Sequence, residues 1–314
     1  MKKLKKRKKK HQMKRINRYI RDNLADLEGK KVIVTGANSG IGFSICDVLL
    51  FKDAHIVMAC RNMQRAEEAR DLLMQRHPNA FIDIVMFDQS SLSSIDHFVQ
   101  LLKNEHNDFY ALILNAGVFS PKKSSTFENY VPLTIGTNFL GPLYLLSLIQ
   151  DFLTTVKTEK RIILQGSLAY HFVHYKNKNL SLLNGKQSLM KQYFISKLGI
   201  SQVFSFYSSS NTNPYVKYLL AEPGISNTQI IRNYKKWFKI IANGFLSVFL
   251  HSNVKASLSA CHLACQIVAN GDYYRPRGLW SVSGYPHLSH FKKKRVDYRI
   301  IIDGLDVLGS LYAK

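Results

Sequence analysis

The sequence has few acidic residues for its length. Its 314 residues include 21 Asp and Glu against 44 Lys and Arg, which gives a formal net charge of +23 at neutral pH. Residues 1–21 hold 12 of these basic residues and no acid, and the rest of the chain still carries +11. A run of like charge is solvated, repels itself and suits an anionic surface. The leading interpretation of Lys2–Lys10 is a solvated, disordered extension, and contact with anionic lipid or nucleic acid remains open.

The sequence also lacks a cysteine framework. Its four cysteines form no CxxC pair, and no second pair of metal ligands follows Cys261, His262 and Cys265. These spacings argue against a disulfide-rich secreted scaffold and against a structural zinc site. We expect buried thiols, no metal and a reducing compartment, which indicates a cytoplasmic protein.

Long apolar runs, linkers and repeats are absent as well. The charged start leads into the mixed segment Met13–Leu27, so no secretory signal is expected. The longest suspicious apolar stretch, Ile240–Leu250, is shorter than the roughly 20 residues that span a bilayer, so we predict no transmembrane segment. Without a repeat or a linker, we expect one domain over residues 29–314. A basic extension over residues 1–28 precedes it, and Arg15–Leu27 is a candidate helix.

The chain does contain an alternation of two hydrophobic patterns. Short β-branched runs predict strands, and the segments between them have apolar residues at helical spacing. Apolar strands linked by helices are typical of a parallel sheet covered on both faces, so the predicted fold class is α/β, doubly wound. The predicted strands are Lys31–Thr35, Ile56–Ala59, Phe81–Phe87, Ala111–Leu114, Arg161–Leu164 and Val216–Leu220, and the predicted helices are Ile41–Phe51, Met63–Gln75 and Leu92–Lys103.

A glycine-rich turn follows the first predicted strand. Gly36 permits a tight turn, Gly40 lets the backbone approach a pyrophosphate, and Gly42 allows close packing of helix on strand. The helix that begins there presents its N-terminus to the phosphates. We therefore predict a bound dinucleotide, although an ordinary strand-to-helix turn is the alternative for the glycines taken alone. The other residues of the predicted phosphate cradle are Asn38, Ser39 and Ile41.

The spelling of this turn, TGxxxGxG, resembles the short-chain dehydrogenase/reductase family. Further matches follow in the family's order over about residues 29 to 285. The resemblance implies a single-domain Rossmann-type sheet with helices on both faces, a nicotinamide cofactor and the interconversion of an alcohol and a carbonyl. It implies that Asp88 contacts the adenine, and that the NAG motif formed by Asn115, Ala116 and Gly117 lies beside the cofactor. The cofactor residues that it implies are Asp88, Gln89, Asn115, Ala116, Gly117, Tyr193, Lys197, Pro223, Gly224, Ile225 and Thr228.

The position that selects between the two nicotinamide cofactors carries no acid. An acid about 20 residues past the glycines accepts hydrogen bonds from the adenosine ribose and repels a 2′-phosphate. Here the second strand ends in Cys60, Arg61 and Asn62, and Arg61 offers a planar cation that suits a phosphate. We therefore predict NADP(H) over NAD(H), with Arg61 and Asn62 in the cofactor site. A solvated arginine that leads into a helix is the alternative.

Tyr193 and Lys197 are the predicted proton-transfer pair. They lie four residues apart in a helix-compatible segment, so their side chains share one face. We expect the Lys197 cation and the positive nicotinamide to lower the pKa of the Tyr193 phenol, so that it acts as general acid and base. The resemblance implies that Lys197 also holds the nicotinamide ribose.

Ser167 and Asn138 complete the predicted catalytic set. Ser167 follows an apolar strand, and its hydroxyl is predicted to hydrogen-bond the substrate oxygen or, in the alternative, to cap a turn. The family's usual serine before it is replaced here by Gly166. Asn138 lies in an apolar segment, where its amide needs partners. The resemblance implies that it positions a water linking Lys197 to solvent, and a bracing role is the alternative.

Residues of about 227–252 stand where this family places its substrate lid, and they are rich in aromatic and aliphatic side chains. With Ala59–Asn62, the long interval from Ser167 to Tyr193 and the element Pro276–Gly278, the chain resembles the retinol-dehydrogenase-like branch. This implies a lipophilic alcohol or carbonyl substrate. A core segment or a dimer contact is the alternative for residues 227–252.

The leading hypothesis is therefore an NADP(H)-dependent oxidoreductase. A catalytically silent NADP(H)-binding sensor or scaffold of the same fold is the alternative. The Lys run shows no aromatic interleaving and no recognition motif, so no specific nucleic acid is expected. Peripheral contact with a membrane through the basic extension and the lid remains open, and so does assembly into a homodimer or homotetramer.

Overall fold

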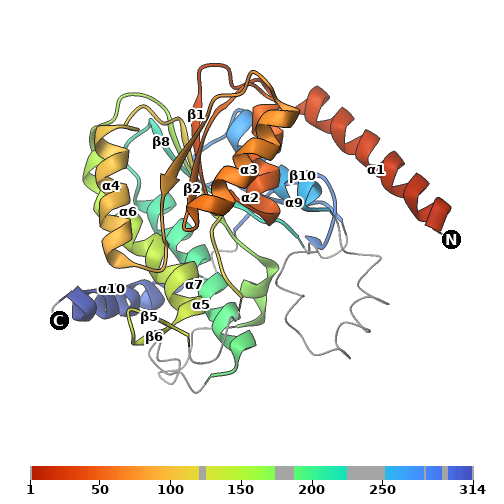
Figure 1. Cartoon of the computed structure of the whole chain (residues 1–314). Coiled ribbons are helices and arrows are strands. Elements are labelled where there is room, and N and C mark those ends of the chain that lie inside the picture. The colour runs from red at the N-terminus through yellow and green to blue at the C-terminus, as the bar shows by residue number, and fades with distance from the viewer. Residues whose placement is uncertain are drawn as a thin grey trace.

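The computed structural model contains an eight-stranded sheet with helices on both faces (Figure 1). It describes residues 2–119, 125–173, 187–224, 252–278, 281–291 and 296–312, with side chains from residue 11 onward. Neighbouring strands pair in parallel except β9 and β10, which are antiparallel. In sheet order the strands are β10 (Pro286–Ser289), β9 (Tyr273–Pro276), β8 (Val216–Ala221), β7 (Lys160–Gln165), β4 (Ala111–Leu114), β1 (Lys31–Thr35), β2 (His55–Cys60) and β3 (Ile82–Met86).

Each face of the sheet is covered by its own group of helices (Figure 1). Alternate residues of a strand point to opposite faces, and in β1 Val32 and Val34 join one apolar cluster while Ile33 joins the other. The first cluster includes α2 (Gly40–Leu50), α3 (Met63–Arg76) and α9 (Asn253–Cys265). The second includes α4 (Leu92–Asn104), α6 (Gly141–Thr155), α7 (Leu189–Ser210) and α10 (Arg299–Tyr312).

The predicted fold class is confirmed. All six predicted strands are present, and the three predicted helices are α2, α3 and α4. The sequence patterns missed β9, the antiparallel edge strand β10 and the short hairpin of β5 (Thr126–Phe127) and β6 (Val131–Pro132). The four cysteines are buried and unpaired, as expected.

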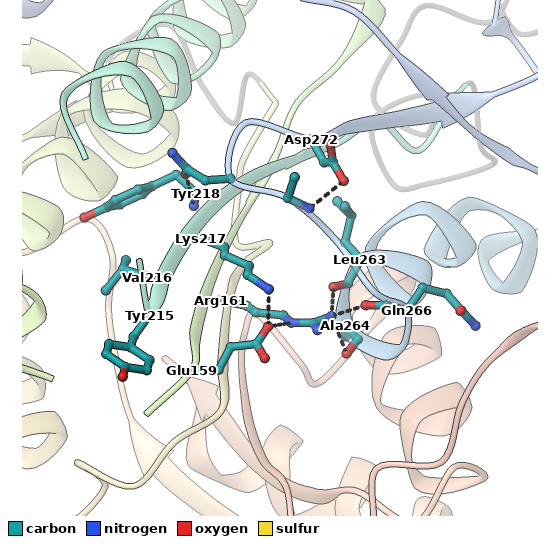
Figure 2. A network of polar contacts seen from close by, with 12 residues as sticks. Glu159, Arg161, Tyr215, Val216, Lys217, Tyr218, Leu263, Ala264, Gln266 and Asp272 are labelled. Carbon is teal, nitrogen blue, oxygen red and sulfur yellow. Dashed lines mark hydrogen bonds and ion pairs between the residues drawn. The ribbon is translucent and has the colours of Figure 1, made fainter. Parts of the chain in front are cut away.

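A buried arginine fastens α9 to the middle of the sheet, as Figure 2 shows. One guanidinium nitrogen of Arg161, on β7, donates to the carbonyl oxygens of Leu263, Ala264 and Gln266 at 2.7, 3.0 and 2.7 Å. Its Nε donates to Glu159, which also accepts from Lys217. The last carbonyl groups of a helix lack hydrogen-bond partners within the helix and carry partial negative charge. A cation at this end donates hydrogen bonds to them and balances that charge.

The basic extension is helical in the structure and partly built into the fold, and its helix includes most of the candidate helix predicted from Arg15. The solvation of Lys2–Lys10 stays a prediction. Helix α1 spans Lys2–Asn23 and projects from the body in Figure 1. Its second half is anchored, because Tyr19 stacks on Tyr285 with ring centroids 4.5 Å apart and its hydroxyl lies 3.3 Å from His262. The extension's apolar side chains that join the cluster on α2 and α9 are Ile16, Ile20, Leu24 and Leu27.

Among the described residues, Leu133–Thr155 forms one helical stretch that is long and apolar enough to span a membrane, whereas Ile240–Leu250 lies outside the described residues. It combines α5 (Leu133–Ile135), the π-helical turn η1 (Gly136–Leu140) and α6. By length and composition it could cross a membrane, but 78% of its most apolar window is buried inside the fold. Helix α6 packs against α4 and joins the second apolar cluster, so this stretch serves as a core element.

Candidate active site

The predicted site residues gather at the carboxyl edge of the parallel strands. The glycine turn follows β1, the NAG motif follows β4, Ser167 follows β7, and Pro223 and Gly224 follow β8. Ligands of open α/β sheets bind outside this edge. The fold therefore brings together residues that are up to about two hundred positions apart in the chain.

The glycine turn is shaped by close backbone packing. Gly36 has a φ of +65°, and a Cβ there would lie 3.0 Å from Cα of Ala116. A Cβ on Gly42 would lie 2.3 Å from the carbonyl oxygen of Gly36 and 2.6 Å from the Asn115 amide nitrogen. Both positions therefore require glycine, and the close contact of helix α2 with β1 depends on Gly42.

The start of α2 fits a phosphate group. Gly40 has a φ of +62°, and a Cβ there would meet no atom within 4 Å, so the backbone is open on that side. Ser39 occupies the N-cap of α2, but its side chain makes no capping hydrogen bond. The first N–H groups of the helix therefore keep their capacity to donate to an anion. Asn38, Ser39, Gly40 and Ile41 lie where a dinucleotide's pyrophosphate is expected.

Side-chain hydrogen bonds of Asn115 and Gln89 connect neighbouring backbone segments beside the predicted cofactor site. The Asn115 amide donates to the Thr35 carbonyl oxygen at 2.9 Å, and the Ala116 N–H donates to the Thr35 hydroxyl at 2.9 Å. The buried Gln89 amide donates to the carbonyl oxygens of Ala116 and Thr137 at 3.0 and 2.7 Å. These side chains fix the NAG motif, which ends at Gly117, against β1 and the segment around Thr137.

Arg61, Asn62 and Asp88 lie together at the adenosine end of the predicted site. Arg61 is exposed at the end of β2, and its guanidinium is 3.9 Å from the Asp88 carboxylate. Asn62 caps α3 by accepting from the Arg65 N–H at 2.8 Å. Asp88 accepts from the N–H and the hydroxyl of Ser90 at 2.9 and 2.6 Å. Asn62 and Asp88 are thus oriented by local bonds, while Arg61 keeps a solvent-accessible cation.

Ser167, Tyr193 and Lys197 converge from β7 and α7. The Ser167 hydroxyl lies close enough to the Tyr193 phenol to lower its pKa, and the Lys197 ammonium lies 6.0 Å from the centre of the Tyr193 ring. Lys197 is buried and donates to the Gln165 carbonyl oxygen at 3.0 Å. Ser167 also accepts from the Ala169 N–H at 3.2 Å as the N-cap of η2 (Leu168–Phe172), so it both caps a turn and meets Tyr193.

Burial has the largest effect on the pKa values of Tyr193 and Lys197. Burial raises the pKa of the Tyr193 phenol, and the hydrogen bond with Ser167 opposes this only in part. Burial also lowers the pKa of Lys197 to about 8, against the attraction of the Glu222 carboxylate. Taking both groups out of water disfavours their charged forms. Tyr193 therefore rests as a neutral phenol. The lowering of the Tyr193 pKa by Lys197 together with a bound nicotinamide stays a prediction.

Asn138 braces the chain around the NAG motif. It lies in η1, and its amide both accepts from the Val118 N–H at 2.7 Å and donates to the Val118 carbonyl oxygen at 2.8 Å. It also donates to the Ser196 hydroxyl at 3.2 Å. These contacts use the side chain for positioning, and the proposed water between Lys197 and solvent stays a prediction. Single π-helical turns often occur at functional sites.

Comparison with known proteins identifies the family. A sequence model described as short chain dehydrogenase matches residues 30–177. The chain is 31% identical over 209 residues to retinol dehydrogenase 13 of Homo sapiens, which covers 67% of this chain and 62% of that protein. The chain belongs to the short-chain dehydrogenase/reductase family. Members of the family are oxidoreductases that bind a nicotinamide cofactor and act on alcohol or carbonyl groups.

Two further relatives show how far the likeness extends. A WW domain-containing oxidoreductase of Pongo abelii is 36% identical over 147 residues, which is 47% of this chain and 35% of that protein. The chain thus matches about a third of the length of that short-chain dehydrogenase/reductase relative. A crystal structure of an uncharacterised protein from Mycobacterium paratuberculosis shares the fold with a TM-score of 0.68 at 21% identity, and covers 93% of this chain and 96% of that one.

Some predicted family residues lie outside the described part of the chain. Ile225, Thr228 and nearly all of the lid segment at about 227–252 belong to this group. Sequence reasoning in turn missed Glu222 and Gln165, which flank Lys197. The signal for Glu222 was an acid directly between the buried end of β8 and Pro223.

Proposed function

We propose that this short-chain dehydrogenase/reductase is an NADP(H)-dependent enzyme that interconverts a lipophilic alcohol and its carbonyl compound. The observation that carries the proposal is the convergence of Ser167, Tyr193 and Lys197 at the carboxyl edge of the sheet, beside the open glycine turn. A phenol, a hydroxyl and a buried ammonium in this arrangement provide a proton donor, an oxygen partner and a cation.

The residues divide the chemistry of carbonyl reduction among them. The cofactor, when bound, supplies the hydride to the carbonyl carbon. Tyr193 donates its phenolic proton to the substrate oxygen, and the Ser167 hydroxyl hydrogen-bonds that oxygen and polarises the carbonyl. The Lys197 ammonium stabilises the phenolate that remains. Alcohol oxidation reverses each of these steps.

The preference for NADP(H) is supported by Arg61. Its side chain is 61% exposed at the end of β2 and lies 3.9 Å from Asp88, so it can turn toward a 2′-phosphate. A guanidinium can form paired, charge-assisted hydrogen bonds with a phosphate. The described residues place no acid on β2 that would take the ribose hydroxyls in the manner of an NAD(H)-specific enzyme.

A lipophilic substrate is supported by aromatic side chains around Tyr193. Phe119 meets the Tyr193 ring edge-on at 4.9 Å between centroids. Phe172, in η2, remains 72% exposed beside Phe194, with their rings 5.5 Å apart. Exposed aromatic surface next to a polar reaction centre suits an apolar substrate with one oxygen to be held. One relative is itself named a retinol dehydrogenase.

We further propose a cytoplasmic protein that contacts anionic membrane surfaces through the basic half of α1. The projection of α1 from the body and the absence of acid in residues 1–21 support this proposal. Polybasic segments gain about 1 kcal/mol per basic residue near such a surface.

The decisive experiment replaces Tyr193 with phenylalanine. Purified wild-type protein and Tyr193→Phe are assayed with NADPH against apolar aldehydes and ketones of graded size, and NADPH binding is measured by fluorescence titration. We expect turnover to fall by about 10²-fold or more, because general acid catalysis is lost, while NADPH binding stays near wild type.

Tyr207→Phe is the matched control for this experiment. Tyr207 lies on the same helix and is buried against Tyr218, so its substitution removes a hydroxyl away from the site. Its turnover should match that of the wild type. Near-normal turnover in Tyr193→Phe contradicts the proposed role. A wild-type protein that binds NADPH and reduces no carbonyl supports the silent alternative.

A further inference from the structure

Glu222 is a fully buried acid next to the predicted catalytic centre. It follows β8 directly, precedes Pro223 and Gly224, and has no accessible surface. A carboxylate without water costs several kcal/mol unless charges or hydrogen bonds compensate it. A buried acid at this edge of the sheet therefore needs an explanation.

The sheet register directs Glu222 toward α7. Gln165 pairs with Ala221, so the next residues, Gly166 and Glu222, lie side by side and share a face. A Cβ placed on Gly166 would lie 3.4 Å from Cγ of Glu222 and 3.1 Å from a Leu220 methyl group. Gly166, which stands where the family usually has a serine, therefore lies directly against the Glu222 side chain.

Glu222 is surrounded by groups that respond to its charge. Lys197, on α7, donates at 3.0 Å to the carbonyl oxygen of Gln165, the residue paired with Ala221 just before Glu222. Tyr273 and Arg275 lie on β9, and the charges of Lys197 and Arg275 act on the Glu222 carboxylate. Tyr170, from η2, acts in turn on Tyr273. Burial raises the pKa of Glu222 to about 7, while the Tyr273 hydroxyl, Arg275 and Lys197 pull it down. Glu222 in turn raises the pKa of Lys197 against its burial.

Polar atoms around Glu222 are left with unused hydrogen-bonding capacity. Neither carboxylate oxygen of Glu222 and neither amide atom of Gln165 makes a well-formed side-chain hydrogen bond within the described residues. The Tyr273 hydroxyl and Nε of Arg275 likewise make no well-formed hydrogen bond within the described residues. Buried groups of this kind are ordinarily satisfied by water or a ligand. The cluster of side chains around Glu222 is thus polar, and its members respond to the charge of the carboxylate.

Resting on the proposed function, we propose that Glu222 is a positioning residue that keeps Lys197 in its ammonium form. The carboxylate acts on the Lys197 ammonium through its charge. No bond is made or broken at Glu222. It acts by making the loss of the Lys197 proton less favourable, so that the cation stays available to the Tyr193 phenolate.

The test compares the pH dependence of kcat in Glu222→Gln and wild type. Reduction should slow as pH rises through the Lys197 pKa, since the ammonium is then lost. Without the Glu222 charge, deprotonation becomes easier, and this alkaline limb should move to lower pH by about one unit. Glu222→Asp, which retains the charge, should move it less. NADPH binding near pH ~6, where Lys197 is charged in both proteins, should not change.

Glu159→Gln is the matched control, because Glu159 is a paired acid at the opposite end of β7. Its alkaline limb should match that of the wild type. A uniform loss of kcat in Glu222→Gln without a displaced limb overturns the inference, since a merely structural acid would behave in that way.

An infrared measurement tests the same coupling without turnover. The carboxylic-acid C=O band of Glu222 should titrate near the pKa of about 7 and vanish in Glu222→Gln. In Lys197→Met its midpoint should rise, because the attracting cation is gone. An unchanged midpoint overturns the inference. A wild-type protein without turnover contradicts the proposed function alone, and the infrared result then decides the role of Glu222.

Discussion

Burial sets the resting protonation of Tyr193 and Lys197, the proposed catalytic pair. The Tyr193 phenol has a raised pKa and Lys197 a lowered one of about 8, so at neutral pH the structure offers a neutral phenol beside a charged amine. This is the state that the proposed reduction requires, in which Tyr193 would donate a proton. Oxidation needs the phenolate, so the positive charge of a bound oxidised cofactor would matter more in that direction.

Arg61 gives a direct test of cofactor preference. We expect Arg61→Ala to weaken NADPH binding about 10- to 100-fold, because a charge-assisted hydrogen bond to the 2′-phosphate is worth about 1.5 to 3 kcal/mol. Binding of NADH, which has no such phosphate, should change little. Both constants are obtained by fluorescence titration.

Arg65→Ala is the control for this comparison. Arg65 is an exposed cation in the first turn of α3, close in sequence to Arg61. It tests whether any lost positive charge has the same effect. An equal loss of NADPH affinity in both variants, or a loss for NADH as large as that for NADPH, argues against a specific phosphate contact at Arg61.

Individual site residues were predictable where a motif fixes their backbone. Gly36 and Gly42 follow from a tight turn and a close helix, and Tyr193 with Lys197 follows from helical spacing. The partners of Asn138 and the burial of Glu222 were not predictable, because they depend on segments brought together by the sheet register. The balance of burial against charge at Tyr193 was missed for the same reason.

Secondary structure was predictable where its pattern is strong. The central strands are apolar and β-branched, and they were found almost to the residue. Strand β9 reads Tyr-Tyr-Arg-Pro and β10 reads Pro-His-Leu-Ser, so neither shows the expected alternation. Helix α1 was expected to be disordered over its basic half because of like-charge repulsion, but its backbone is helical from Lys2.

The link between β7 and α9 should dominate the stability of that helix. We expect Arg161→Met to lower the free energy of unfolding by about 3 kcal/mol or more, since carbonyl groups of α9 and the Glu159 carboxylate lose their buried donor. Lys217→Met removes a more exposed partner of the same carboxylate and should cost about 1 kcal/mol or less. Urea unfolding measures both, and equal losses would contradict a special role for Arg161.

The N-terminal extension contributes to the stability of the whole molecule through its buried apolar side chains. Deleting residues 1–28 removes Ile16, Ile20, Leu24 and Leu27, and burial of each such side chain is worth about 1.5 to 3 kcal/mol. We therefore expect this deletion to lower the unfolding temperature clearly. Deleting residues 1–12 leaves these four side chains in place and should leave stability unchanged.

The shorter deletion also isolates the proposed membrane contact. Flotation with vesicles that contain anionic lipid should recover the full chain at low salt, where charge attraction is least screened. It should recover much less of the 1–12 deletion, which lacks the basic residues that attract anionic lipid. Neutral vesicles serve as the control. Equal recovery of both proteins would argue against the basic half of α1 as a membrane contact.

The Arg161 contacts also have a consequence for the order of folding. The three carbonyl oxygens that accept from Arg161 lie 102 to 105 residues later in the chain. During synthesis, β7 therefore emerges long before α9 exists, and its guanidinium cannot reach its native partners. Long-range contacts of this kind slow folding and leave the unfinished sheet open to aggregation. Arg161 thus lacks its full set of native carbonyl partners until residue 266 has been made.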